Sequence, residues 1–488
     1  MSAFNMDFKN PTTWLLAPLV APLLPFALLS GCDDGGSATG DCTEGETQQC
    51  YCAGGDVGAQ ICETDDTWGE CDCGSADADT DVDTDTDTDV DTDSDTDVDT
   101  DTDTDTDTDV DTDTDTDTGC SGLLTDVYSV SAGSDHTCAL LNSGGVKCWG
   151  SNHYGQLGDG NSGYDQMETV PVDVVGLSYG GEVLSAGGDF TCALMTSGGV
   201  MCWGENGDGQ IGDGTFDDSV VPTDVVDLSS GVSLISTGRR HACVVLGGDN
   251  VKCWGYNEFG QLGNGTTGNQ NTPVDVIGES ALTQFASAGY SHTCGLNLSG
   301  SAMCWGNNAY GQLGNGATSD EHMPVDVTVV SSGALQTIVA GNFAHTCGLL
   351  TTGGVKCWGY NELGQLGNGT TSNSISAMDV SGLSSGVLDI DAGSNFTCAL
   401  LVTGAVKCWG DNSYGQLGNG STGGYETTPV DVVGLSSGVS SIDVGSSSHA
   451  CAVMTAGTVK CWGRNLEGAL GDGTTTNSNT PVDVVCGE

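Results

Sequence analysis

The sequence predicts an all-β protein whose main body is a seven-bladed β-propeller of four-stranded blades. The triplet Cys-Trp-Gly recurs seven times, at intervals of 51–54 residues. Each unit consists of short β-favouring runs separated by Gly and Ser, without helical periodicity. The segments ahead of the repeats differ from them sharply in composition. The predicted domains are a lipoprotein signal peptide (1–31), a short tether (32–41), a Cys-rich disulfide module (42–74), a disordered acidic Asp-Thr linker (75–119) and the propeller (120–488).

The N-terminal segment indicates export. An apolar stretch from Trp14 to Leu29 is interrupted by three prolines, so it is a poor spanning helix but fits a signal-peptide core. It ends in Leu29-Ser30-Gly31-Cys32, which resembles the lipobox of bacterial lipoproteins, where the Cys is acylated. We therefore expect lipidation at Cys32 and anchoring to the bacterial envelope, at the cell surface or outer membrane. The alternative is an ordinary signal peptide followed by a chance cysteine.

Residues 42–73 contain six cysteines in a stretch too small to form an adequate apolar core. With 23 cysteines in the chain, an oxidising compartment is expected, and these six are predicted to form disulfides. Fifteen pairings are possible. A metal site is the alternative, although the spacings match no zinc pattern.

Charge is concentrated in the linker, where Asp occupies every odd position from 77 to 117. Such a segment buries nothing and repels itself, so it is predicted to be an extended, solvated spacer. The remainder is also acidic. Of the 67 acidic residues, 33 precede Cys120, which leaves 34 against 8 basic residues, or a net charge near −26. Nucleic acid is therefore excluded as a partner, because binding phosphates requires Lys and Arg.

The first repeat illustrates the predicted blade. We expect strands at residues 128–132, 136–141, 146–150 and 172–175, and four short strands in about fifty residues are typical of a propeller blade. The chain is expected to enter in mid-blade at Tyr128 and to leave on residues 482–485, the strand that would begin a blade, so the last strand is predicted to pair with the first three. Cys120 and Cys486 flank these ends and are expected to form a disulfide across the closure.

Each Cys-Trp-Gly cysteine has a partner ten residues earlier. An even spacing across an odd-length turn places the two opposite each other on antiparallel strands, close enough for a disulfide. Seven hairpin disulfides are therefore predicted. They are Cys138–Cys148, Cys192–Cys202, Cys243–Cys253, Cys294–Cys304, Cys347–Cys357, Cys398–Cys408 and Cys451–Cys461. The seven Trp residues are expected to pack between blades.

The repeated motifs are Gly-x-x-His-Thr-Cys-Ala-Leu, Trp-Gly-x-Asn-x-x-Gly-Gln-Leu-Gly and Pro-Val-x-Val, over residues 126–485. This pattern resembles the repeat of the regulator-of-chromosome-condensation family, which implies a seven-bladed propeller. Nucleotide exchange by the family's nuclear member depends on an inserted feature, and these units contain no such insertion. Plant ultraviolet receptors of this fold use Gly-Trp-Arg-His-Thr, where this chain has Gly-Ser-Asp-His-Thr at 133–137. The resemblance therefore implies the fold and not these activities.

Repeated polar residues are most simply structural. Five histidines precede the first cysteine of their hairpin by two, but Phe190 and Phe396 occupy this position in two units with intact cysteines. A zinc site is therefore not expected, and the histidines are predicted to be packed and hydrogen-bonded. Lys residues beside the second Cys and Asp residues on the outer strand are predicted to form charge ladders. The His and Asp residues recur with the repeat, as scaffold residues do, and no Gly-x-Ser-x-Gly nucleophile elbow is present, so we expect no catalysis. No metal and no cofactor are expected either.

The order of strands places the loops after the first and third strands on one face, while the other turns are short. Aromatic and Arg side chains, the types favoured at binding hot spots, gather in these loops. The candidate ligand-binding residues are Tyr154, Arg239, Arg240, Tyr256, Phe259, Tyr310, Tyr360 and Tyr414. The sequence thus suggests a monomeric, non-catalytic module that binds a protein or glycan. The alternatives are a secreted propeller enzyme (a lyase or hydrolase), a purely structural or adhesion protein of the envelope, and rings that only pad neighbouring blades.

Overall fold

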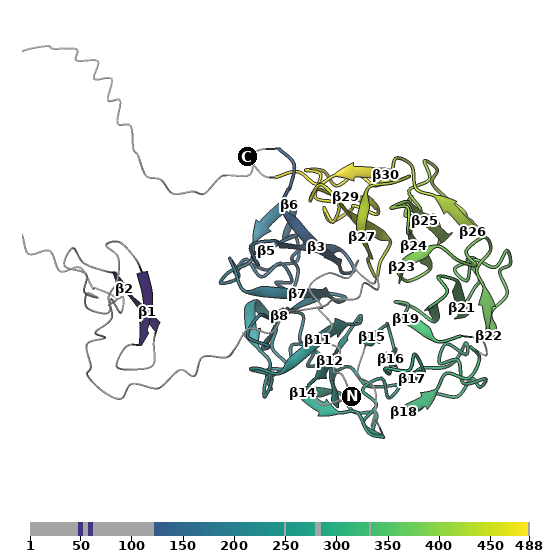
Figure 1. The fold of residues 1–488 in the computed structure, drawn as a ribbon, viewed down its shortest axis with the longest axis horizontal. Coiled ribbons are helices and arrows are strands. Elements are labelled where there is room, and N and C mark those ends of the chain that lie inside the picture. Colours follow the sequence, from purple (N-terminus) through teal and green to yellow (C-terminus); the bar gives the residue numbers. More distant parts are fainter. Residues whose placement is uncertain are drawn as a thin grey trace, which may run out of the picture. The chain divides into compact units, whose positions relative to one another are not determined.

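The computed structural model describes residues 122–486, apart from 248–249, 279–284 and 331–332, together with the backbone of two strands near residue 50. Residues 122–486 form seven four-stranded antiparallel sheets arranged around a central axis (Figure 1). The all-β, seven-bladed prediction is therefore confirmed. In every sheet the strands follow chain order from the axis outward, and we call them inner, second, third and outer.

The inner strands are β3 (Val127–Ala132), β7 (Gly181–Ala186), β11 (Val232–Thr237), β15 (Phe285–Ala288), β19 (Leu335–Ala340), β23 (Val387–Ala392) and β27 (Val439–Val444). The second strands are β4 (His136–Leu141), β8 (Phe190–Met195), β12 (His241–Leu246), β16 (His292–Leu296), β20 (His345–Leu350), β24 (Phe396–Leu401) and β28 (His449–Met454). The third strands are β5 (Val146–Ser151), β9 (Val200–Gly204), β13 (Asn250–Gly255), β17 (Ala302–Gly306), β21 (Val355–Gly359), β25 (Val406–Asp411) and β29 (Val459–Gly463). The outer strands are β6 (Met167–Asp173), β10 (Ser219–Asp224), β14 (Gln270–Asp275), β18 (Glu321–Asp326), β22 (Ser374–Asp379), β26 (Tyr425–Asp431) and β30 (Ser478–Asp483).

The hairpin between second and third strands shows why the cysteines meet. In the first blade the turn places Gly144 at φ 82°, a conformation that glycine adopts without steric cost. Cys138 then lies directly opposite Cys148, with Cα atoms 4.0 Å apart, and the two form a disulfide. The six other blades repeat this arrangement. The seven predicted hairpin disulfides are therefore present.

The outer strand differs from the prediction in its limits. Strand β6 runs from Met167 to Asp173, earlier than the predicted 172–175. The third and outer strands lose register between the Cys148 and Gly150 pairings, after which pairing continues to Met167. Val174 lies beyond the strand and is buried. The predicted strand lies around this buried valine, whereas most of β6 precedes the predicted strand and is only partly buried.

Closure of the ring also differs from the prediction. The last strand, β30, pairs with β29 of its own sheet, and the first blade has its own outer strand, β6. The expectation that the last strand completes the first blade is wrong, because each long loop returns the chain to the edge of its own sheet. Terminal segments join the first and last blades through main-chain bonds, such as Leu124 N to Val484 O at 3.0 Å. Cys486 is disulfide-bonded, while its predicted partner, Cys120, lies outside the described residues.

The buried tryptophans connect each blade to the one before it. Trp203 is fully buried, and its Nε1 donates to the main-chain oxygen of Gln156 in the preceding blade at 2.9 Å. Trp149 makes the ring-closing version of this bond with Ala469 O at 2.9 Å. The other five tryptophans bond the preceding blade in the same way. The predicted packing of Trp between blades is confirmed.

The N-terminal part of the chain is described only by the antiparallel strands β1 (Thr47–Tyr51) and β2 (Val57–Ile61). These strands fall within the predicted Cys-rich module and belong to a different compact unit of the chain from the propeller. The signal peptide, Cys32, the other side chains of this module and the Asp-Thr linker lie outside the described residues. Among the residues that the structure describes, no helix is long and apolar enough to cross a membrane.

Candidate functional site

The loops between inner and second strands surround the axis on one face, and we call them the axial loops. Their main chains bond one another from blade to blade, as in Ser134 N to Gly188 O (3.0 Å), Gly188 N to Arg239 O (3.0 Å) and Arg239 N to Gly289 O (3.1 Å). The loops after the third strands reach the same face, since Tyr256 N donates to the main-chain oxygen of Arg240 at 2.9 Å. Because these bonds use only the main chain, the side chains are free to differ between blades.

Five side chains from blades three to five form what we call the aromatic–arginine surface. They are Arg239, Tyr290 and Phe343 of the axial loops, and Tyr310 and Tyr360 of the loops after the third strands. The Tyr310 and Tyr360 rings lie 4.9 Å apart, and Phe343 lies 5.2 Å from Tyr360 and 6.3 Å from Tyr290. The Arg239 guanidinium lies 4.8 Å from the centre of the Tyr290 ring.

The second predicted arginine has a different environment. Arg240 contacts Asp208 at 2.6 Å and Glu205 at 3.5 Å, and its guanidinium lies 5.3 Å from the Tyr256 ring. Burial raises the pKa of Glu205, an effect that Arg240 opposes. Burial, with a hydrogen bond to Glu258, raises the pKa of Tyr256 to about 12. Arg240 therefore holds blades two and three together and already has carboxylate partners.

The predicted site residues thus fall into separate groups. Tyr310 and Tyr360 belong to the aromatic–arginine surface with Arg239. Tyr256 contacts Phe259 at 6.4 Å in a neighbouring cluster with Arg240. Two further predicted residues, Tyr154 and Tyr414, are exposed and form no ring contact with either group. Burial raises the pKa of Tyr154, on which the charges of Glu205 and Arg240 also act.

Sequence reasoning missed Tyr290 and Phe343. Both stand in axial loops at the position of Arg239, two residues before the second strand begins, where the other four blades carry Ser or Gly. Alignment of the axial loops would have found them, because two rings among small residues at one repeated position are unusual. Phe343 keeps 39% of its surface exposed, so part of the cluster faces solvent.

The inner strands line the axis with a second ring of bonds. Ser131, next to last in its strand, accepts a hydrogen bond from the main chain of Ala186 in the next blade at 2.9 Å. Blades six and seven carry Asp at this position. Asp391 accepts from Val444 N at 2.6 Å and Asp443 from Ala132 N at 3.2 Å. The two carboxyls lie close enough to interact, and the charge of Asp391 adds to the effect of burial in raising the pKa of Asp443.

Burial raises the pKa of each carboxyl on this side of the axis. For Asp391 it reaches about 6, and for its neighbour Asp389, which also feels the Asp391 charge, about 7. The pKa of Asp443 is raised well above its usual range by burial and by Asp391. The acidic group lies among the inner strands of blades six, seven and one, apart from the aromatic–arginine surface.

The five repeated histidines are structural. His136 is fully buried, and its Nε2 lies 2.8 Å from Thr191 Oγ1 of the next blade. Thr191 donates its only hydroxyl hydrogen to Gln156 O, so the histidine must donate from Nε2. The other four histidines bond a threonine of the next blade likewise. In the part of the chain that the structure describes, no group of three or more His, Cys, Asp or Glu residues is arranged to hold a metal.

Each of the two units that lack the histidine is followed by a unit that lacks the threonine. Phe190 is followed in the next blade by Ala242, and Phe396 by Ala450, and each pair lies in one buried cluster. A phenyl ring cannot hydrogen-bond a hydroxyl, and the smaller alanine accommodates it. The seven blade junctions therefore use either a polar His–Thr contact or an apolar Phe–Ala contact.

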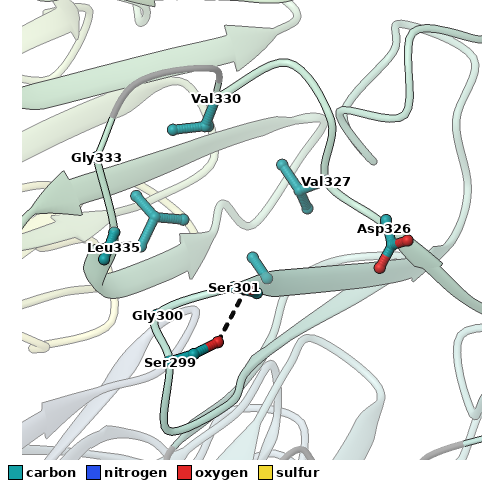
Figure 2. Close-up of a pocket in the computed structure, with 10 residues that line it drawn as sticks. Ser299, Gly300, Ser301, Asp326, Val327, Val330, Gly333 and Leu335 are labelled. Carbon is teal, nitrogen blue, oxygen red and sulfur yellow. Dashed lines mark hydrogen bonds between the residues drawn. The ribbon is translucent and has the colours of Figure 1, made fainter.

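The opposite face of the propeller has short turns, and a hollow of about 490 Å³ lies on it in blade four (Figure 2). Figure 2 shows Val327 and Val330 on one side of it and the Ser299–Ser301 hydrogen bond, 3.1 Å long, on the other. Among its described lining residues, Asp326 is the only ionisable one. The described lining thus has a single charged side chain, whereas the loop-rich face brings aromatic and arginine side chains together.

Comparisons with solved structures show the same architecture. Human WBSCR16 superposes with a TM-score of 0.62 at 23% identity, covering 70% of this chain and 94% of that one. Yeast RCC1 (Prp20), in a structure with Kap60 bound, superposes with a TM-score of 0.60 at 19% identity, covering 75% and 85% of the two chains. At these identities the likeness establishes the fold alone.

Sequence comparisons establish the family. The ultraviolet-B receptor UVR8 of Arabidopsis thaliana is 31% identical over 303 residues, covering 61% of this chain and 68% of the receptor. The human E3 ubiquitin-protein ligase HERC2 is 30% identical over 358 residues, which cover 71% of this chain but only 7% of the ligase. The profile of the RCC1-like domain matches residues 45–397, and RCC1-repeat profiles match 387–416, 403–453 and 439–469. The chain therefore belongs to the family of RCC1-like domain proteins, built from seven RCC1-type repeats.

Proposed function

We propose that this chain is a non-catalytic binding module that recognises a protein through the aromatic–arginine surface. One observation carries the proposal. Rings from blades four and five gather beside an arginine from blade three, and Arg239, Tyr290 and Phe343 stand at an axial-loop position where the other four blades carry Ser or Gly. Aromatic and arginine side chains dominate the binding energy of protein interfaces. The fold is that of a protein-binding scaffold, as the structure of yeast RCC1 with Kap60 illustrates for that protein.

The proposal includes an anchor at the envelope. Lipid on Cys32 would hold the chain at a membrane, and the acidic linker would extend the propeller away from it. Both features rest on the sequence pattern. A Cys32→Ser variant that still partitions with membranes would remove this part of the proposal and leave the binding face untouched.

The test uses quantitative capture with the whole chain. The wild type, Phe343→Ala, Tyr360→Ala and Leu298→Ala would be immobilised at equal density and exposed to envelope and secreted proteins. Leu298 is the matched control, because it is 69% exposed on the short-turn face. A partner retained by the wild type and by Leu298→Ala, but weakened at least about tenfold by each ring variant, supports the proposal. A partner lost only with Leu298→Ala would move the site to the other face.

A further inference from the structure

The described propeller contains eight basic side chains, and seven of them form ion pairs within it. Five lysines pair with an Asp of the outer strand in their own blade. Arg240 pairs with Asp208 and Glu205, and Arg464 pairs with Asp135. Arg239 is exposed and forms no ion pair within 4 Å of any described residue, although its charge opposes the rise that burial causes in the pKa of the Asp189 carboxyl. On a body with a net charge near −26, an arginine outside every described ion pair is an exception that requires an explanation.

The backbone fixes Arg239 in this position. Its N–H donates to Gly289 O at 3.1 Å, and its carbonyl accepts from Gly188 N at 3.0 Å. A Cβ atom at Gly188 would lie 2.3 Å from the Arg239 carbonyl oxygen and 3.0 Å from its Cγ, so only glycine leaves room for this loop. The position of the side chain is therefore built by three consecutive blades.

The contact with Tyr290 leaves the hydrogen-bonding capacity of Arg239 available. The guanidinium carbon lies over the Tyr290 ring, an aromatic ring accepts no conventional hydrogen bond from it, and no side-chain hydrogen bond joins Arg239 to a described residue. A planar fork of donors fits a carboxylate through two parallel hydrogen bonds. A polyanion such as nucleic acid is disfavoured, because the acidic body repels it. The group that best fits Arg239 is therefore a single carboxylate.

We infer that Arg239 binds a carboxylate of a protein partner that places an apolar or aromatic side chain against the neighbouring rings, an inference that rests on the proposed function. The rings meet edge to face, with interplanar angles of 65° for Tyr310–Tyr360 and 70° for Phe343–Tyr360. Such a corrugated surface suits a protruding side chain, whereas a sugar ring stacks on a flat platform. The partner would thus present Asp, Glu or a C-terminal carboxylate beside an apolar residue.

The experiment compares two peptide arrays probed with the whole chain. In the first array, one Asp or Glu stands beside Phe, Leu or Tyr, and in the second, Asn or Gln replaces the acid. The wild type should bind its best carboxylate peptides at least tenfold more tightly than their amide counterparts. Arg239→Gln should abolish this preference, and Arg239→Lys should restore only part of it, because an ammonium cannot form the paired bonds.

Controls separate this inference from the proposed function. Lys356→Gln makes the same change in net charge at a paired lysine of blade five, so it should keep the preference. Equal binding of both arrays, lost in Phe343→Ala, would refute the carboxylate and leave the protein-binding function standing. Binding of oligogalacturonate in place of any peptide would refute a protein partner. Arg239-dependent self-association in sedimentation would show that the occupant is a second copy of this chain, and it would also overturn the inference.

Discussion

Blades three to five and blades six, seven and one carry the same axial loops but use their side chains differently. In blades six, seven and one the loop serines bond within the ring, as in the 2.8 Å contact between Ser134 Oγ and Ser446 Oγ and the bond from Ser394 Oγ to Ser446 O. In blades three to five the same loops carry Arg239, Tyr290 and Phe343. Arg239 and Phe343 each contact Tyr290, and both are exposed to solvent. The main-chain bonds of the ring are shared by both halves. Closure of the ring therefore places no demand on these side chains, and one half has become a candidate surface.

The two halves also differ beneath the loops. Inner strands of the first four blades place Ser near the axis, and blades six and seven place Asp391 and Asp443 there. Both residue types accept the same main-chain hydrogen bond from the next blade, such as Ala288 N to Ser236 Oγ at 3.1 Å and Val444 N to Asp391 at 2.6 Å. The substitution keeps the bond and adds an ionisable group. Blades three to five are thus distinguished by the side chains of their axial loops, and blades six and seven by the carboxyls of their inner strands.

The largest expected effect is one that the halves should share. Trp358 and Trp409 are both fully buried, one in each half, and each bonds the preceding blade. Trp358→Ala and Trp409→Ala should each lower the free energy of unfolding by about 3–5 kcal/mol, through lost burial and a cavity. Guanidinium denaturation of the oxidised chain measures this. Costs that differ by more than about 2 kcal/mol would contradict a common scaffold.

An intermediate effect should separate the halves by pH. Raised pKa values mean that folded Asp389, Asp391 and Asp443 hold protons that the unfolded chain releases above about pH 4. Their favourable contribution is therefore present below about pH 4 and lost as the pH rises to about 7. Asp389→Asn with Asp443→Asn should raise stability at pH 8 by about 1–3 kcal/mol and change it little at pH 4. The exposed Asp224→Asn is the control, and an equal gain at both pH values would rule out this titration.

The buried histidines act in the opposite sense. Burial lowers the pKa of His241 to about 3 and of His345 to about 4, so these groups stay neutral in the fold. The unfolded chain binds their protons below about pH 6.5. The stability that depends on them is present above that pH and lost as the pH falls. Acid should therefore destabilise the His–Thr junctions, while the Asp group resists it.

The smallest expected effect concerns a single junction. His345→Phe alone leaves Thr397 without its donor and places a larger ring against it, and it should cost about 1–2 kcal/mol at pH 7. The double variant His345→Phe with Thr397→Ala reproduces the pair found at Phe396 and Ala450. It should regain at least about 1 kcal/mol, which a double-mutant cycle by denaturation measures. Additive costs would show that the two junction types are not interchangeable.

Much of the fold could be predicted because the repeat is local. Spacing within a repeat located the hairpins, and an even separation was enough to place Cys138 opposite Cys148. The sheet to which the last strand belongs could not be predicted. In a ring of similar repeats, the sequence does not show which of the four strands begins a blade. Only the path of the long loop shows that β30 pairs with β29.

The site was less predictable, because its contacts join different repeats. Arg240 and Asp208 lie in neighbouring blades, so their ion pair cannot be inferred from their separation in the chain. The sequence of one repeat does not show the role of Tyr290, because its contacts are with Arg239 of the preceding blade and Phe343 of the following blade. The Phe190–Ala242 junction could have been found, since each Phe-containing unit is followed by the alanine.

The return of every outer strand to its own sheet has an evolutionary consequence. A blade whose four strands follow one another in the chain is encoded by one uninterrupted stretch of sequence. Here the copied stretch of gene and the folded blade coincide, so recombination between any two repeats inserts or removes a whole blade with its disulfide and junction tryptophan. Each inserted blade also brings one axial loop. Ligand specificity in such a lineage can therefore be exchanged one blade at a time.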